Sequence, residues 1–148
     1  MFVHEVLRSA KSHASALPPD ARLPEAAILL RREGSNAIVV HDGPLHDEPM
    51  GVVTERCIID GLAHHGEAAR LVEVQAIMNR EFIACAPQDQ VEEVLRRMVE
   101  KRRRHVLVMQ AGQLVGVLSI DNMLLFLLEA EKLEKDLLRD YFLGLGYH

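Results

Sequence analysis

Two hydroxyl side chains, Thr54 and Ser119, stand where a short aliphatic strand is expected to meet a helix. Each follows a glycine and two aliphatic residues, in the segments 51–54 and 116–119. A Ser or Thr at a helix N-cap accepts a hydrogen bond from an otherwise unpaired backbone N–H. The same position puts a hydroxyl at the positive end of a helix, which suits an anion. The two segments therefore predict a pair of similar helix starts, each a candidate anion site.

Six cationic residues crowd one short stretch of the chain. They are Arg96, Arg97, Lys101, Arg102, Arg103 and Arg104. One interpretation is a solvated face with favourable charges at a helix C-terminus. In a second interpretation, Arg104 and His105 lie at the start of a strand, beside a cleft, and reach an anionic ligand. Nucleic-acid binding is the least favoured interpretation, because no aromatic stacking residues are interleaved with the cations.

The eight histidines invite a test for a metal site. His41, His46, His64 and His65 fall in or near expected loops, without the i, i+4 or cysteine-paired spacing that zinc sites use. We recognise no nucleophile–base pair, glycine-rich phosphate loop or carboxylate dyad. We therefore expect no metal site and no catalytic residue.

The two cysteines, Cys57 and Cys85, fit a reducing compartment better than a disulfide scaffold. Cys57 is expected near a helix N-terminus, which favours the thiolate. It is either a redox-reactive thiol or an inert, partly buried one, and the second interpretation is favoured. Cys85 lies in an apolar strand and is expected only to pack.

The elements that hold these residues occur twice, in the same order. Apolar residues at i, i+3, i+4 and i+7 predict helices over 23–30 and 91–98, each after a proline turn. Gly34 and Gly66 are expected to end helices. A linker at 11–16 is expected to end in a short strand, and 41–49 to form a hairpin loop. Other helices are expected at 2–9, 55–63 and 74–78, and strands at 37–40, 50–53, 82–85, 106–109 and 114–118.

A shift of 68 residues superposes the two halves as far as the strand hairpin. It places Pro19 on Pro87, Glu25 on Glu93, Leu30 on Met98 and Val40 on Val108. The shift falls to 65 after the hairpin, because the first loop is longer than the tight turn at 111–112, and Thr54 then meets Ser119. One strand–helix–strand–strand–helix unit has too small a core to stand alone. We therefore expect two units that bury their sheets against each other around a pseudo-twofold axis, with two central clefts.

Composition sets the remaining bounds. At 148 residues, with 49% hydrophobic and 26% charged residues, the chain can form one compact unit with a buried core. The formal net charge of −5 gives no general attraction to nucleic acid or anionic lipid. The first residues do not resemble a signal peptide, and the apolar run at 123–128 is too short to span a bilayer. We expect a cytoplasmic protein with no membrane and no nucleic-acid partner.

Residues 123–143 are expected to form one helix about 30 Å long. Its apolar positions step by three or four, at Phe126, Ala130, Leu133, Leu137 and Tyr141. The first two turns can cover the second half of the chain, whereas the later turns have no core of their own to meet. We expect these later turns to pack on a second chain, which makes the protein a homodimer. The sequence at 143–146 is expected to end the helix and leave the last residues loose.

With these features in view, the chain resembles a tandem CBS-domain pair, the Bateman module, over roughly residues 2–127. The pattern Pro-x-x-x-(Leu/Val)-x-Glu-(Ala/Val), beginning at Pro19 and Pro87, is typical of that family, as are the strand at 104–108 and the two Gly-aliphatic-aliphatic-(Thr/Ser) strand ends. The resemblance implies an α+β fold for residues 1–148 as a single module. It implies CBS repeats at 2–66 and 67–129, with a C-terminal helix extension and tail at 130–148. It also implies a non-catalytic ligand sensor that commonly dimerises into a flat disc.

The resemblance implies roles for particular residues. In ligand-binding relatives the helix-start motif is Gly-h-h-(Ser/Thr)-x-x-Asp, where the hydroxyl contacts phosphate and the Asp takes the ribose hydroxyls. In this chain the Asp positions are Cys57 and Asn122. A thiol cannot accept two ribose hydrogen bonds, and Asn retains one acceptor oxygen. Asp121 lies one residue early, about 100° away around a helix, and does not replace the missing carboxylate. Because Asn122 keeps an acceptor and Cys57 does not, the second repeat is the favoured adenosyl site.

Two functions are therefore weighed. The first is a regulatory CBS pair that binds AMP, ADP, ATP or S-adenosylmethionine between its repeats, forms a homodimer and acts on an unidentified regulated protein. Its candidate ligand-binding residues are Thr54, Arg104, His105, Ser119, Asp121 and Asn122. The alternative is a ligand-free structural dimerisation or protein-interaction module, which the changes at Cys57 and Asn122 favour. Neither function requires a cofactor.

Overall fold

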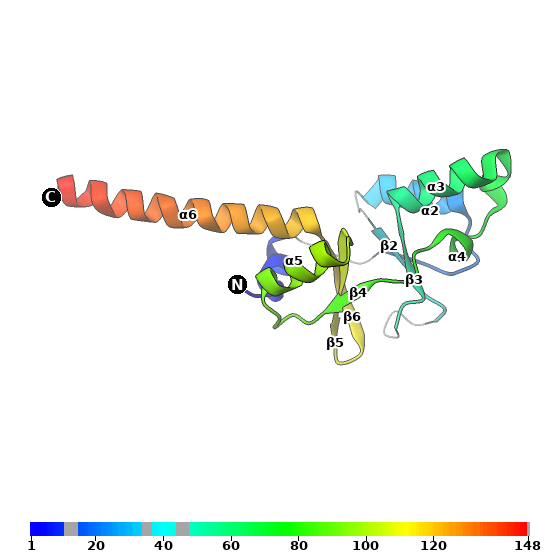
Figure 1. Cartoon of the computed structure of the whole chain (residues 1–148), viewed down its shortest axis with the longest axis horizontal. Helices are drawn as coiled ribbons and strands as arrows, with labels where there is room; N and C mark the ends of the chain where they lie inside the picture. Colours follow the sequence, from blue (N-terminus) through cyan, green and yellow to red (C-terminus); the bar gives the residue numbers. More distant parts are fainter. Residues whose placement is uncertain (11–14, 34–36, 44–47, 148) are drawn as a thin grey trace.

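The structure of the chain is a computed structural model that describes residues 1–10, 15–33, 37–43 and 48–147. Figure 1 shows two lobes side by side, each with a small sheet and its own helices, and a long helix that leaves the second lobe. The predicted helix end at Gly34 and residues 44–47 of the predicted hairpin loop lie outside the described residues.

The first lobe is a three-stranded sheet with two helices. Its elements are β1 (Ser15–Leu17), α2 (Leu23–Glu33), β2 (Ala37–Val40), β3 (Gly51–Thr54) and α3 (Glu55–His65). β1 runs parallel to β2, and β2 runs antiparallel to β3. Gly66 ends α3 with a φ of 58° and donates its N–H to the Leu62 carbonyl. Glycine adopts this backbone without a Cβ clash, and the predicted end of α3 is confirmed.

The second lobe repeats this arrangement. Its elements are β4 (Ile83–Cys85), α5 (Val91–Glu100), β5 (His105–Gln110), β6 (Gln113–Ser119) and α6 (Ile120–Tyr147). β4 runs parallel to β5, and β5 runs antiparallel to β6. The β5–β6 turn has positive φ at Ala111 (52°) and Gly112 (77°), which is the backbone of a type I′ hairpin turn.

The strand register confirms the predicted internal repeat. Ala37 pairs with Thr54 in the first lobe, and His105 pairs with Ser119 in the second. These partners are the ones that shifts of 68 and 65 residues superpose. The chain is therefore an α+β fold built from two copies of one unit, as predicted.

Each sheet is buried on both faces. In the first lobe Ile38, Val40 and Val53 share a core with α2 and α3. The intervening residues Ala37, Val39 and Val52 join a different core with Leu107 of the second lobe. Side chains alternate between the faces of a strand, so one face meets the helices and the other meets the opposite sheet. This explains why all four residues of β2 are apolar and buried.

The N-terminal helix α1 (Val3–Ala10) packs on the second lobe rather than on the first. Val3 and Val6 are fully buried in the core that contains β5, β6 and α5. The Val3 N–H donates to the Asp89 carbonyl at 3.0 Å, and the Val91 N–H donates to the Met1 carbonyl at 2.9 Å. Figure 1 shows α1 beside α5 at the base of α6.

The segment between the lobes packs on the first lobe, just as α1 packs on the second. A 3₁₀ helix at Gly66–Leu71 leads to α4 (Val74–Ile77), and Val74 is fully buried in the first lobe's core. The Val74 N–H donates to the Ala21 carbonyl at 2.7 Å, and Asn79 pairs with Val52 of β3. The core of the first lobe therefore includes residues on both sides of positions 66 and 67, where the sequence predicts the boundary between the repeats. That boundary stays a prediction.

The helix α6 is longer than the sequence predicts at both ends. It begins at Ile120 and continues through Gly144 and Gly146 to Tyr147. The expectation that these glycines end the helix is wrong. An interior glycine costs about 1 kcal/mol relative to Ala but keeps its N–H and C=O, so it weakens a helix without breaking it. His148, the last residue, lies outside the described residues.

Candidate functional site

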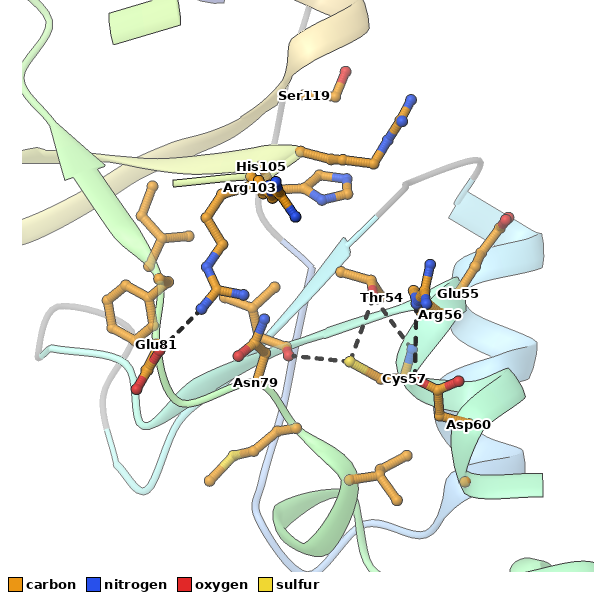
Figure 2. Close-up of a pocket in the computed structure, with 18 of the residues that line it drawn as sticks. Thr54, Glu55, Arg56, Cys57, Asp60, Asn79, Glu81, Arg103, His105 and Ser119 are labelled. Carbon is orange, nitrogen blue, oxygen red and sulfur yellow. Dashed lines mark hydrogen bonds and ion pairs between the residues drawn. The ribbon is translucent and has the colours of Figure 1, made fainter. Parts of the chain in front are cut away.

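A cleft of about 1070 Å³ lies between the two lobes. Its walls are the start of α3, the inter-lobe segment at 76–82, the residues 102–105 that lead into β5, and the junction of β6 with α6. Figure 2 shows Thr54, Cys57 and Asp60 on one side and Arg103 and His105 on the other. A cleft of this volume is large enough for a nucleotide-sized ligand.

Thr54 begins α3 with an extended backbone, and its Oγ1 accepts a hydrogen bond from the Cys57 N–H at 3.3 Å. The Thr54 hydroxyl in turn donates to the Cys57 sulfur at 3.4 Å. The Cys57 thiol donates to the Val52 carbonyl at 3.8 Å. The Cys57 thiol, at the position where the resemblance implies a carboxylate, therefore contacts the end of its own strand.

Ser119 begins α6 with a reciprocal cap. Its Oγ accepts from the Asn122 N–H at 3.0 Å, and the Asn122 Oδ1 accepts from the Ser119 N–H at 2.9 Å. This is the two-way arrangement of a capping box, with Asn in place of Glu or Gln. The amide oxygen that would have to receive a ribose hydroxyl is thus already used by the helix cap.

The cleft brings together five of the six predicted ligand-binding residues. They are Thr54, Arg104, His105, Ser119 and Asp121. Asn122 is not among the cleft-lining residues of the described chain. Arg104 and Asp121 are both exposed at the rim, with their charged groups 3.8 Å apart. Ligand binding by these residues stays a prediction.

The cationic stretch divides into two groups with different surroundings. Arg96 lies on the exposed face of α5 and pairs with Glu93 and Glu100, each at 2.5 Å. Arg97 donates to the Ala84 carbonyl. In contrast, Arg102, Arg103 and Arg104 line the cleft. The helix members form the solvated face of the first interpretation, and those before β5 occupy the position that the second interpretation requires.

Charges on the cleft walls are largely paired. Arg103 lies 3.0 Å from Glu81 of the inter-lobe segment, a contact that Figure 2 shows as a dashed line. Arg56 lies 3.8 Å from Asp60, one turn further along α3. With the Arg104–Asp121 pair, three arginines of the cleft have a carboxylate partner within 4 Å.

His105 places a titratable ring inside this charged cleft. Its Nε2 is buried and has no hydrogen-bond partner within the part of the chain that the structure describes. Burial lowers the pKa of the imidazole, the Arg104 charge lowers it further, and Asp121 opposes the change. The lowered pKa favours the neutral ring, and none of the described residues forms a hydrogen bond with its Nε2.

Cys85 behaves as the sequence predicts for a packing residue. It is buried in the second lobe's core. Burial and the nearby Asp89 carboxylate raise the pKa of the thiol to about 12, against a smaller opposing effect of Arg97. A thiol with such a pKa is not a nucleophile at neutral pH.

Two walls of the cleft are not predicted from the sequence. One is the α3 face beyond Cys57, where Asp60, Gly61 and His64 follow at helical spacing. That spacing was readable, because Thr54 already fixed where the helix starts. The other is the inter-lobe segment at 76–82, whose place depends on α4 crossing to the first lobe. No pattern among neighbouring residues predicts that α4 packs on the first lobe.

Within the described residues, no group of three or more His, Cys, Asp or Glu side chains could hold a metal ion. Over the same residues, none of the helices combines the length and apolarity needed to cross a membrane.

Solved structures with this fold include proteins of similar length. A CBS-domain protein, ATU1752 from Agrobacterium tumefaciens, is 27% identical with a TM-score of 0.77, covering 84% of this chain and 97% of that one. The CBS domain protein PAE2072 from Pyrobaculum aerophilum, complexed with AMP, is 30% identical with a TM-score of 0.71, covering 82% of this chain and 89% of that one.

Curated relatives are longer than this chain. The uncharacterized protein MK0525 from Methanopyrus kandleri is 29% identical over 101 residues, 68% of this chain. The chain spans 50% of MK0525 and 12% of an A-adding tRNA nucleotidyltransferase from Geobacter sulfurreducens. A family profile described as CBS domain matches residues 6–64 and 74–129, one match for each repeat. The chain belongs to the CBS-domain family, as a tandem pair.

Proposed function

We propose that this chain is a non-catalytic regulatory module that binds an adenosine-type ligand in the cleft between its repeats. AMP, ADP, ATP and S-adenosylmethionine are the compounds to test. The observation that carries the proposal is the cleft itself, where the hydroxyl-bearing helix starts of both repeats face the arginines before β5. A hydroxyl at a helix N-terminus and an arginine are both suited to phosphate oxygens.

A relative supports the choice of ligand. PAE2072, 30% identical to this chain, was crystallised with AMP. A ligand that binds one arrangement of the two lobes better than another shifts the population toward that arrangement. Regulation of a partner protein would follow from this shift, because the inter-lobe segment both lines the cleft and pairs with β3.

A ligand-free dimerisation module is the second candidate, and two contacts favour it. The Cys57 sulfur is occupied by the Thr54 hydroxyl and the Val52 carbonyl. The Asn122 oxygen is occupied by the cap of α6. Neither side chain replaces the carboxylate that receives ribose in ligand-binding relatives.

Thermal unfolding with each adenosyl compound separates the two candidates. A ligand at 100 times its dissociation constant adds about 2.7 kcal/mol, which raises the midpoint by several degrees. We expect Arg104→Ala to reduce that rise. Arg96→Ala is the matched control, because this arginine lies outside the cleft and pairs on α5. No rise with any of the four compounds would contradict the sensor and leave the dimerisation module.

We also propose that the protein forms a homodimer through the later turns of α6. These turns leave the lobe, as Figure 1 shows, and Leu133, Leu137 and Leu138 are each more than half exposed. Leu133 and Leu137 belong to the stripe that steps by three or four residues, the spacing with which helices pair. Most helix stability in proteins comes from packing of an amphipathic face rather than from propensity, and a second copy of the same stripe would supply that packing.

A further inference from the structure

The loop that ends α5 has the hydrogen bonds of a Schellman motif. The Arg103 N–H donates to the Met98 carbonyl at 2.9 Å, and the Arg102 N–H donates to the Val99 carbonyl at 3.2 Å. In this motif the residue that follows the helix C-cap takes a left-handed backbone. Here that residue is Arg102, with a φ of 54°.

Glycine is the residue that this backbone favours, because a Cβ is strained at positive φ. The internal repeat supplies a comparison within the same chain. The shift of 68 residues places Arg102 on Gly34, and the four residues Arg-Arg-Arg-His at 102–105 on Gly-Ser-Asn-Ala at 34–37. The second repeat thus has an arginine where the first repeat has the residue best suited to a helix end.

The side chain of Arg102 differs from the other cleft arginines in its partners. Arg56, Arg103 and Arg104 each lie within 4 Å of a carboxylate. For Arg102 the described residues provide no hydrogen-bond or ion-pair partner for the guanidinium, although the residue lines the cleft. Among the residues that the structure describes, Arg102 is therefore the one cleft arginine that can bind an incoming anion without first giving up an ion pair.

We propose that Arg102 is an affinity-determining residue for the anionic group of the cleft's ligand. The strained backbone at this position is tolerated because arginine, unlike glycine, supplies a free guanidinium to the cleft. Strained residues gather at ligand sites for this kind of reason. The inference rests on the proposed function and adds to it a phosphate-bearing ligand, since a guanidinium binds phosphate oxygens with charge-assisted, bidentate hydrogen bonds.

The decisive variant is Arg102→Gly in the full chain. Removing the backbone strain should raise the unfolding midpoint of the ligand-free protein by about 2–4 °C. The same variant should weaken binding of the best adenine nucleotide, measured by calorimetry, at least tenfold. Stability and binding thus move in opposite directions, which a purely structural residue would not produce. Arg102→Lys, which keeps a cation, should retain more of the affinity than Arg102→Gly.

Ala111→Gly is the matched control. Ala111 has a similar φ of 52° but lies in the β5–β6 turn and is not among the cleft-lining residues. It should raise the midpoint in the same way and leave binding unchanged. Wild-type affinity in Arg102→Gly would overturn the inference while leaving the sensor proposal intact.

Sodium tripolyphosphate separates the inference from the sensor proposal. If the wild type binds none of the adenosyl compounds, the sensor proposal fails. Binding of tripolyphosphate that is lost in Arg102→Gly would then still support Arg102 as an anion-binding residue. Absence of tripolyphosphate binding in that case, or binding that survives Arg102→Gly, would overturn the inference as well.

Discussion

The pKa of His105 makes the charge of the cleft depend on pH. Its pKa is lowered first by burial and then by the Arg104 charge, with Asp121 opposing. An unfolded histidine titrates near pH 6.5. Between the lowered pKa and about 6.5 the unfolded chain therefore binds a proton that the folded chain does not. The contribution of neutral His105 to the free energy of unfolding is therefore fully present above about pH 6.5. It is lost as the pH falls from there through the lowered pKa.

We therefore expect the His105→Gln variant to have a free energy of unfolding that depends less on pH. The wild type should lose more free energy of unfolding between pH 7.5 and pH 5.5 than the variant does. Urea unfolding at several pH values measures both curves, and their difference removes the contribution of the other histidines. Parallel curves for the two proteins would contradict a lowered pKa at His105.

At the scale of single residues, the sequence located the helix starts but not all of their surroundings. Thr54 and Ser119 cap α3 and α6 as predicted, because a capping hydroxyl acts on a backbone N–H only three residues away. The Asn122 oxygen accepts from the Ser119 N–H, a contact that the sequence did not predict, and ligand binding by Asn122 stays a prediction. The Glu81–Arg103 pair joins residues 22 apart, and no pattern along the chain brings those charges together.

At the scale of elements, β3 and the inter-lobe segment approach each other closely at Gly51. A Cβ added at Gly51 would lie 2.8 Å from the Asn79 carbonyl oxygen and 2.8 Å from the Met78 sulfur. The oxygen belongs to the backbone that pairs with Val52, so it cannot move aside without breaking that pairing. Gly51 therefore sets how closely the segment can approach the sheet.

We expect Gly51→Ala to lower the free energy of unfolding by about 1–3 kcal/mol, the usual effect of overpacking. Gly61→Ala is the comparison, because the atoms nearest its Cβ are side-chain carbons of Leu23 and Ile77, at 2.9 and 3.0 Å. Alanine at that helical position also gains helix propensity. Urea unfolding of both variants tests the argument, and an equal loss in both would show that the Asn79 backbone is not the obstacle.

The strands and helices could be predicted from the sequence because their patterns depend on residues two to four positions apart. The end of α6 could not be predicted in this way. Gly144 and Gly146 carry a strong local signal for termination, yet the helix continues to Tyr147. Propensity is a weak term that a long helix can absorb, so a glycine pair alone does not fix where a helix ends.

At the scale of the whole molecule, the later turns of α6 test the proposed dimer. A chain truncated after Glu129 should sediment as a monomer, whereas the full chain should sediment as a dimer. Leu133→Glu with Leu137→Glu should have the same effect, because both side chains are exposed in the single chain and belong to the apolar stripe. Glu131→Ala, which leaves the stripe unchanged, is the control.

Sedimentation velocity measures all four proteins at one concentration. A truncated chain that remains a dimer would contradict the role given to α6. In that case the dimer interface would be sought at the exposed apolar residues of α3 and of the first turns of α6. Ile59 and Leu124 are exposed there, at positions that the 65-residue shift superposes. A full chain that sediments as a monomer would contradict the dimer altogether.

The crossing of α1 to the second lobe has a consequence for the order of folding during synthesis. Val3 and Val6 have no partners until α5 and the start of α6 have been made, because their core is formed by residues 83–123. Translation adds about 5–20 residues per second, so α1 waits on the order of ten seconds with its apolar face in water. The first lobe likewise lacks Val74 until the inter-lobe segment emerges. The first lobe therefore completes its core at Met78, before any strand of the second lobe has been made, whereas α1 is buried only after the chain has been synthesised as far as Met123.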